Sequence, residues 1–350
     1  MTDRLPLGER VLAGDPRAIA RAISIIEDDS PAAAGLVRQL FPHTGGAYLV
    51  GVTGPPGAGK STLVDRMVTD ARASGETIGV IAVDPTSPFT GGSILGDRLR
   101  MQTHFGDPGV FIRSMATRGH LGGLARTTSD VAVVLDAAGK SIVIVETVGV
   151  GQGEVDIVRT ADISIVVLVP GTGDDVQALK AGLMEIADIY VVNKADREGA
   201  DRMVTSIESN LALQSFGEGQ WRPPIVRTEA TTGTGVPDLW AAIRAFRAHT
   251  EGTRQTRLAA RQDYRLRELL ARRFLSHVES RVLAPGEFEA LVTRIAAREL
   301  DPYSAASAIM SRALGTAQEA LGRCGWITSA SRLAPPTPPR RGTATALGCR

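Results

Sequence analysis

The segment from residue 54 to residue 61, GPPGAGKS, constrains the fold of this chain more than any other feature. It fits the pattern G-x-x-x-x-G-K-[ST], which works only between a strand and a helix. Residues 47–53 (AYLVGVT) form a short apolar run rich in β-branched residues, as in a buried strand. Apolar residues then recur with helical spacing, at Leu63, Val64, Met67 and Val68. The context therefore predicts an α/β fold in which this loop joins a strand to a helix.

The loop has the chemistry of a phosphate site. Its glycines allow backbone N–H groups to turn inward, and the helix that follows adds partial positive charge. Lys60 is expected to reach the β- and γ-phosphates, and the Ser61 hydroxyl to bind Mg²⁺. A glycine-rich turn without a ligand is the alternative, but it does not explain this Lys-Ser pair. The predicted phosphate-binding residues are Gly54, Pro55, Pro56, Gly57, Ala58, Gly59, Lys60, Ser61 and Thr62.

A second motif, NKAD at residues 193–196, follows the apolar strand-like run DIYVV. Loops of this kind lie at the carboxyl ends of strands, where α/β sheets bind ligands. Asp196 can accept hydrogen bonds from the guanine N1–H and 2-amino groups, a donor pair that adenine lacks. Asn193 is expected to contact N7 and hold the loop, and the Lys194 stem to lie along the base. A helix cap is the alternative for NKAD alone; together with the phosphate loop it predicts GTP and GDP as ligands and GTP hydrolysis as the reaction.

A further base-side loop is expected after the strand PIVRT, which ends at residue 228. It consists of Glu229, Ala230 and Thr231.

Acidic residues follow two other predicted strands. TIGVIAV ends before Asp84, and SIVIV ends before Glu146, which stands where phosphate-loop proteins usually carry an aspartate. Both strands are expected to flank the strand of the phosphate loop in a parallel sheet. Buried carboxylates are costly unless they are paired or bind a metal. With Asp97, they are predicted to form a carboxylate cluster near Mg²⁺, some binding through water and one orienting the attacking water. A helix cap or a surface salt bridge is the alternative for Asp97.

The predicted catalytic residues are Lys60, Asp84 and Glu146, and the predicted metal-side residues are Ser61, Asp84, Asp97 and Glu146. Glycines at positions 149, 151 and 153 suit a mobile switch that senses the γ-phosphate.

The chain divides into four predicted parts. Residues 1–45 form an N-terminal helical extension, with helices expected at 15–27 and 32–40. Residues 46–250 form a phosphate-loop GTPase core with a mostly parallel central sheet. Residues 251–330 form a C-terminal helical arm, and the Pro-rich residues 331–350 form a disordered tail. The remaining core strands are expected at 77–83, 110–112, 141–145, 163–169, 189–192 and 225–226.

The helical arm carries an apolar stripe that must be buried against something. Its residues recur every four positions: Leu266, Leu270, Phe274, Val278 and Val282. A second copy of the chain or the same chain are the two alternatives. The arginines at 261, 265, 267, 272 and 273 are expected to form a solvated face, with a phosphate or acidic-partner site as the alternative.

Composition excludes several classes. Charge is balanced, with 39 Lys+Arg against 38 Asp+Glu, so no nucleic-acid partner is expected. The two cysteines, Cys324 and Cys349, both lie late in the chain and form no metal-ligand pattern. No leader-like apolar segment and no run of about 18 apolar residues occurs, so we expect a cytoplasmic protein without a membrane partner.

Several segments in order resemble the MeaB/ArgK family of GTPases associated with methylmalonyl-CoA mutase and its relatives. They are GVTGPPGAGKSTL, VIAVDPTSP, GGSILGDRLRM, RGHLGGLA, VETVGVGQGE, PGTGDDVQALKAGLMEIADIYVVNKAD and LDPYSAA, within about residues 10 to 328. The resemblance implies an α/β GTPase core with helical extensions, a homodimer in which residues 251–330 form the dimerisation arm, and Ser61, Asp84, Asp97 and Glu146 on the metal side. It implies that residues 171–182 form a mobile loop coupling nucleotide state to the mutase. One segment departs from the common pattern, since EAT at 229–231 stands where many GTPases carry Ser-Ala.

The function that this resemblance implies is a G-protein chaperone of an adenosylcobalamin-dependent acyl-CoA mutase, which gates cofactor loading and protects or reactivates the mutase. Methylmalonyl-CoA mutase is the leading partner, and isobutyryl- or ethylmalonyl-type mutases are alternatives. A rival function is a metallochaperone GTPase that delivers nickel or zinc, although the segments at 84–100 and 146–160 contain neither Cys nor His. A small-molecule kinase is a third alternative, and NKAD argues against it.

Overall fold

The computed structural model describes residues 5–85, 102–104, 106–117, 123–147, 160–171 and 183–323. The chain divides into two compact units, Met1–Arg265 and Leu266–Arg350. The predicted tail at 331–350, Asp97, the glycines at 149–153 and most of the loop at 171–182 lie outside the described residues.

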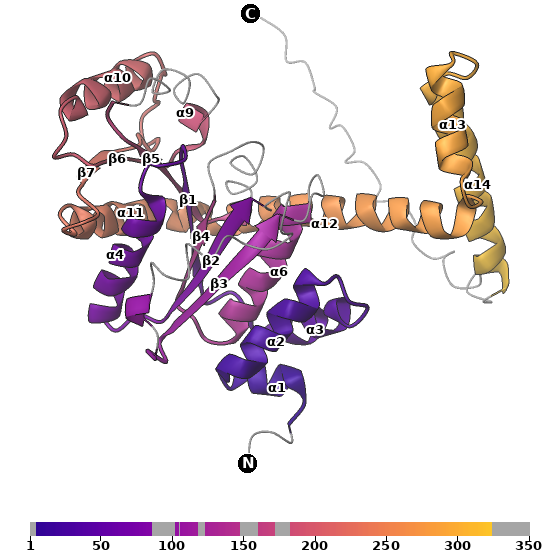
Figure 1. Ribbon diagram of the computed structural model, residues 1–350, viewed down its shortest axis with the longest axis horizontal. Helices are drawn as coiled ribbons and strands as arrows, with labels where there is room; N and C mark the ends of the chain where they lie inside the picture. The colour runs from indigo at the N-terminus through magenta and orange to yellow at the C-terminus, as the bar shows by residue number, and fades with distance from the viewer. Residues whose placement is uncertain are drawn as a thin grey trace, which may run out of the picture. The chain divides into compact units, whose positions relative to one another are not determined.

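A seven-stranded sheet forms the centre of the first unit (Figure 1). In chain order its strands are β1 (Tyr48–Thr53), β2 (Ile78–Pro85), β3 (Val110–Thr117), β4 (Ile142–Glu146), β5 (Ile163–Leu168), β6 (Ile189–Asn193) and β7 (Ile225–Thr228). Every pairing in the sheet is parallel, and the spatial order is β3-β2-β4-β1-β5-β6-β7. The predicted α/β class and mostly parallel sheet are therefore confirmed.

The strand order corrects one expectation. We expected the strands before Asp84 and Glu146 both to flank β1, but β1 lies between β4 and β5. β4 pairs with β1 on one side and with β2 on the other, so Glu146 is the register partner of both Val52 and Ala82. β2 is therefore one strand further from the phosphate loop, because β4 is inserted between strands that precede it in the chain.

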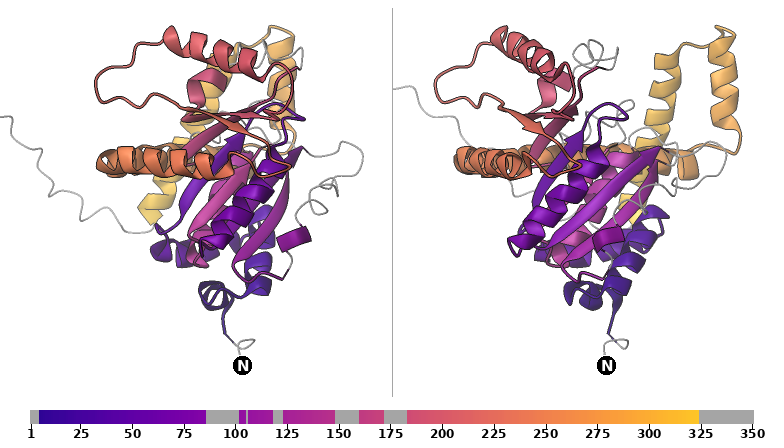
Figure 2. Two further views of the ribbon diagram at one scale, coloured as in Figure 1. Left: turned by 90° about the vertical axis from the view of Figure 1, so that its left-hand side faces the viewer. Right: turned by 60° about the vertical axis from the view of Figure 1, so that its left-hand side comes forward.

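Helices cover both faces of the sheet (Figure 2). One face packs against α4 (Lys60–Ala73) and α11 (Val236–Thr250), through residues such as Met67 and Phe246. The other face packs against α6 (Gly123–Ala137), with α2 (Pro16–Glu27) and α3 (Ala33–Leu40) in the same apolar cluster, and against α10 (Ala200–Ala212) further along.

The N-terminal helices begin with α1 (Leu7–Leu12), which the sequence patterns did not indicate. α2 begins as predicted from the Asp-Pro pair. The Asp15 carboxylate caps it by accepting the N–H groups of Arg17 and Ala18. The remaining short elements are η2 (Phe41–His43), η3 (Gln102–His104), α9 (Leu183–Ile186) and η4 (Glu251–Thr253).

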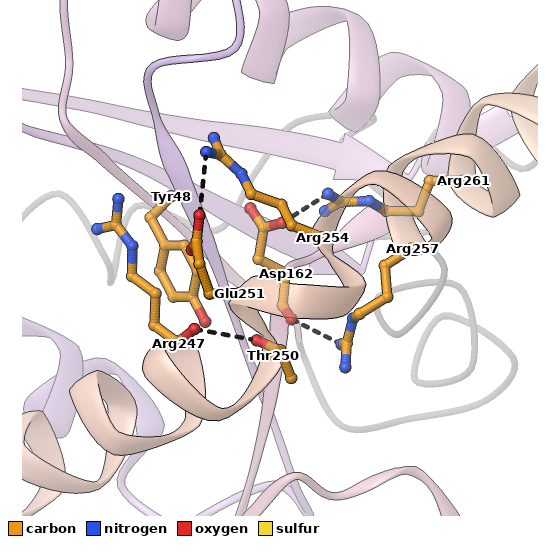
Figure 3. A pocket seen from close by; sticks show the side chains of 8 residues that line it. All are labelled: Tyr48, Asp162, Arg247, Thr250, Glu251, Arg254, Arg257 and Arg261. Atoms are coloured by element: carbon orange, nitrogen blue, oxygen red, sulfur yellow. Dashed lines mark hydrogen bonds and ion pairs between the residues drawn. The ribbon is translucent and has the colours of Figure 1, made fainter.

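Arginines at the start of α12 (Arg254–His277) contact the core near the amino ends of the strands (Figure 3). Arg261 forms an ion pair with Asp162, and Arg265 with Asp130, both at 2.5 Å. Arg257 donates to the Asp162 carbonyl oxygen at 2.9 Å. The prediction of a solvated face is therefore wrong for Arg261 and Arg265, because their side of α12 lies over core carboxylates.

The second unit contains η5 (Val278–Val282), α13 (Glu287–Ala296) and α14 (Pro302–Arg323). Val278, Ala305 and Ala313 are buried. Much of the predicted apolar stripe is exposed instead: 57% of Leu266, 60% of Leu270 and 39% of Phe274. In the part of the chain that the structure describes, no helix is both long and apolar enough to span a bilayer.

Asp188 stands at the amino end of β6. Its carboxylate accepts the Ser164 N–H at 2.8 Å, and burial raises its pKa from 3.8 to about 6, against the lowering effects of that hydrogen bond and of Arg257. It lines a cavity of about 520 Å³ together with Trp221, whose indole N–H donates to the Asp188 carbonyl oxygen. Because the folded state holds this proton more tightly than the unfolded state, ionised Asp188 destabilises the fold above pH 6.

Replacing Asp188 with Asn should remove this penalty while keeping an acceptor for Ser164 N–H. At pH 7.5 we expect the free energy of unfolding to rise by up to about 3 kcal/mol, from a pKa shift of roughly two units. The advantage should shrink as pH falls through 6 and vanish below about 3.8, where the wild-type carboxyl is protonated in both states. Urea unfolding followed by circular dichroism at pH 5 and 7.5 measures it, and a pH-independent difference would contradict the assignment.

Candidate nucleotide-binding site

The predicted phosphate loop turns from β1 into α4 at the carboxyl edge of the sheet, and two of its glycines are required by close packing. Gly54 has φ 142°, and a Cβ there would lie 2.1 Å from the Val167 carbonyl oxygen. Gly59 precedes α4 with φ 83°, and its Cβ would lie 2.5 Å from the Asn193 amide nitrogen. No other residue fits either position. The loop therefore packs directly against β5 and against the NKAD motif.

Lys60 is the first residue of α4 and is 6% exposed. Its ammonium donates to the carbonyl oxygens of Gly54, at 2.8 Å, and Pro55, at 3.0 Å. These bonds fold the side chain back over the loop. A positive charge is thus held at the centre of the loop.

Ser61 and Glu146 meet beside this lysine. The Ser61 hydroxyl donates to Glu146 Oε1 at 2.6 Å, and Glu146 is only 5% exposed as the last residue of β4. A hydroxyl and a carboxylate are hard oxygen donors of the kind that Mg²⁺ prefers. The donor set therefore fits the predicted metal.

The other two predicted carboxylates are those of Asp84 and Asp97. Asp84 lies in β2, two residues beyond the register partner of Glu146, so its backbone reaches the same edge of the sheet. Its side chain and the whole of Asp97 lie outside the described residues. The structure brings together Lys60, Ser61 and Glu146.

Asn193 joins the phosphate loop to both base-side loops. Its amide nitrogen donates to the Ala58 carbonyl oxygen at 2.8 Å. Its carbonyl oxygen accepts from the Thr228 hydroxyl and from the Ala230 N–H, both at 3.1 Å. The side chain is 1% exposed, so these contacts take place away from water. The predicted role of holding the loop corresponds to these three bonds.

The other NKAD residues are more exposed than Asn193. Lys194 adopts φ 55° and donates to the Gly57 carbonyl oxygen at 2.9 Å, which lays its stem across the phosphate loop. Asp196 is exposed. The Ala195 N–H donates to the Thr228 carbonyl oxygen at 3.0 Å and ties the motif to the end of β7.

The second base-side loop is held by contacts that the sequence motifs did not reveal. Thr228 bonds to Asn193, and Arg66 of α4 donates to the carbonyl oxygens of Ala230 and Thr231. Nothing in the helical pattern distinguishes Arg66 from a surface arginine. A threonine at a strand end is equally unremarkable in the sequence.

The site combines a glycine-rich loop that encloses a lysine, a hydroxyl–carboxylate pair and two adjoining loops. This combination is typical of a phosphate-loop nucleotide hydrolase. The family model described as "Methylmalonyl Co-A mutase-associated GTPase MeaB" matches residues 19–282. The chain belongs to this family, and it is a GTPase that binds GTP and GDP.

Individual relatives agree with this family. A Pyrococcus abyssi protein named as a GTPase is 53% identical over 314 residues, covering 88% of this chain and 96% of that protein. The mouse protein "Methylmalonic aciduria type A homolog, mitochondrial" is 34% identical over 264 residues, covering 70% of this chain and 62% of the mouse protein. A solved structure titled as a LAO/AO transport system kinase superposes with a TM-score of 0.64 at 25% identity, covering 87% of this chain and 95% of that chain.

The Asn193 contacts lead to a prediction. Replacing Asn193 with Ala removes three buried bonds and leaves the Ala58 carbonyl and the Ala230 N–H without this partner. We expect GTP affinity to fall by at least about tenfold, because losing one buried hydrogen-bond partner typically costs about 1–3 kcal/mol. Titration with a fluorescent, non-hydrolysable GTP analogue measures the change, with circular dichroism to verify the fold. Wild-type affinity in a folded variant would refute the role of Asn193.

Proposed function

We propose that this GTPase is the nucleotide-dependent chaperone of an adenosylcobalamin-dependent acyl-CoA mutase, of the methylmalonyl-CoA mutase type. The match to the mutase-associated family model over residues 19–282 carries the proposal. The name of the mouse relative, which refers to methylmalonic aciduria, points to the same metabolic context. GTP hydrolysis would then time the loading of the cofactor and the protection or reactivation of the mutase.

The site residues have separate proposed roles in hydrolysis. Gly54 to Thr62 surround the phosphates, and the Lys60 ammonium balances their charge. The base lies against Asn193, Lys194 and Asp196 on one side and against residues 229–231 on the other. In the reaction, a water oxygen forms a bond to the γ-phosphorus while the bond from that phosphorus to the bridging oxygen breaks, giving GDP and inorganic phosphate.

Mg²⁺ is the proposed metal of the site. Ser61 and Glu146 would hold it, in agreement with their 2.6 Å contact, and Asp84 and Asp97 are proposed to complete the metal side. Bound there, it would neutralise charge on the β- and γ-phosphates. We propose that one of the carboxylates on the metal side orients the attacking water.

We propose that the second unit mediates homodimer formation. Its exposed apolar side chains support this, since large apolar patches mark interaction sites. They include Leu266, Leu270, Phe274, Phe288, Val292 and Tyr303. A second copy of the chain is the occupant implied by the family. Replacing both Leu270 and Phe274 with Glu should yield a monomer in sedimentation velocity experiments, and a dimer that persists would reject this surface.

The proposed function is tested by steady-state GTP turnover with and without a candidate mutase. We expect intrinsic turnover to be slow and the mutase to stimulate GTP hydrolysis, because GTPases of this mechanism accelerate strongly when a partner completes the site. ATP in place of GTP and the Lys60→Ala variant are the controls, and neither should respond. GTP turnover that ignores methylmalonyl-, isobutyryl- and ethylmalonyl-type mutases would reject the chaperone function while leaving the GTPase intact.

A further inference from the structure

Arg66 lies in α4, the helix that follows the phosphate loop, and reaches across to the second base-side loop. Its Nε donates to the Ala230 carbonyl oxygen at 3.2 Å, and its terminal nitrogen donates to the Thr231 carbonyl oxygen at 2.8 Å. The guanidinium thus engages two consecutive carbonyl groups from one side chain. These contacts join residues 164 and 165 positions apart in the chain.

The partners of Arg66 are backbone atoms rather than a carboxylate. In the described parts of the chain, Arg66 forms no ion pair, although Asp65 is its neighbour. Asp65 instead contacts His104, at 3.1 Å. A planar guanidinium can hold two parallel acceptors in fixed geometry, whereas a lysine ammonium presents only a point charge. The two hydrogen bonds from Arg66 therefore fix the position of the loop at residues 229–231.

The loop is held at the same residue from two directions. The Ala230 N–H donates to Asn193, which belongs to the NKAD motif, and the Ala230 carbonyl accepts from Arg66 of the phosphate-loop helix. Ala230 is 4% exposed, so its backbone has little freedom. Both sides of the proposed base pocket are therefore fixed relative to the phosphate loop and its helix. Asn193 makes one connection and Arg66 makes the other.

We infer that Arg66 is a positioning residue for guanine recognition: it sets the affinity and selectivity for guanine by fixing the loop at residues 229–231. This rests on the nucleotide site proposed above. Arg66 acts through the loop, because it donates to backbone atoms of Ala230 and Thr231. The hydrogen bonds described above for Lys60 and Ser61 do not involve Arg66, so phosphate binding and bond cleavage should not depend on it.

Two variants test the inference. Arg66→Ala removes both bonds, and Arg66→Lys keeps the charge but cannot reproduce the two-carbonyl geometry. We expect GDP to dissociate about tenfold faster from Arg66→Ala, because the variant loses two hydrogen bonds donated by a charged group. The ratio of GDP to ADP affinity should fall by a similar factor, with ADP affinity unchanged. At saturating GTP, kcat should stay within about twofold of wild type, while KM rises. Arg66→Lys should retain a clear part of the defect.

Arg72→Ala is the matched control. Arg72 lies on the same helix and pairs with Asp107 at 2.7 Å, so this change also removes an arginine and its bonds from α4. It should destabilise the protein without altering GDP release or the GDP-to-ADP ratio. Stopped-flow release of a fluorescent GDP, with thermal unfolding of each variant, provides the readouts.

The outcomes distinguish a failure of the role of Arg66 from a failure of the nucleotide site. Unchanged GDP release and selectivity in Arg66→Ala, or a purely structural effect equal to that of Arg72→Ala, would overturn the role of Arg66. If Arg66→Ala does not fold, wild-type selectivity in Arg66→Lys would overturn it equally. The phosphate site on which this inference rests fails if Lys60→Ala retains GTP affinity. Loss of GTP binding in Lys60→Ala with normal Arg66 variants therefore rejects this inference alone.

Discussion

The buried side-chain amide of Asn193 is the interaction on which the nucleotide site depends. It donates to Ala58 in the phosphate loop and accepts from Thr228 and Ala230 at the second base-side loop. The amide supplies both a donor and an acceptor atom at this position, whereas a carboxylate cannot donate and an aliphatic residue can do neither. Because buried polar groups are costly when unpaired, the three loops are stable only in this mutual arrangement.

The parallel sheet brings the three loops joined by Asn193 to one edge. β1, β6 and β7 all end at the same edge, so the phosphate loop, NKAD and residues 229–231 emerge side by side from distant parts of the chain. β4 ends there too and delivers Glu146 to Ser61. At the opposite edge, Asp162 anchors the start of α12 through Arg261. The proposed nucleotide site thus lies at the carboxyl ends of the strands, while residues near their amino ends hold the start of α12.

Local patterns in the sequence predicted the elements of this fold well. The glycines of the phosphate loop, the helical spacing after Lys60 and the apolar runs at the strands each depend on neighbouring residues. The strand order could not be predicted from these patterns. An apolar run indicates a buried strand but not its neighbours, so nothing in the sequence placed β4 between β2 and β1. The ion pair of Arg265 with Asp130 and the loop contacts of Arg66 were also missed. Both join residues more than a hundred positions apart, and an arginine on a helix looks the same in the sequence whether it contacts water or a distant backbone.

We propose that the site recognises guanine through Asp196, an exposed residue of the NKAD motif. The most direct measurement compares GTP and xanthosine triphosphate hydrolysis by wild type and Asp196→Asn. The account predicts that this substitution reverses the preference, since the new side-chain amide can donate to the xanthine 2-oxo group, whereas the lost carboxylate can no longer accept from the guanine amino group. An Asp196→Asn variant that still prefers GTP as strongly as wild type would contradict the assignment of the base site.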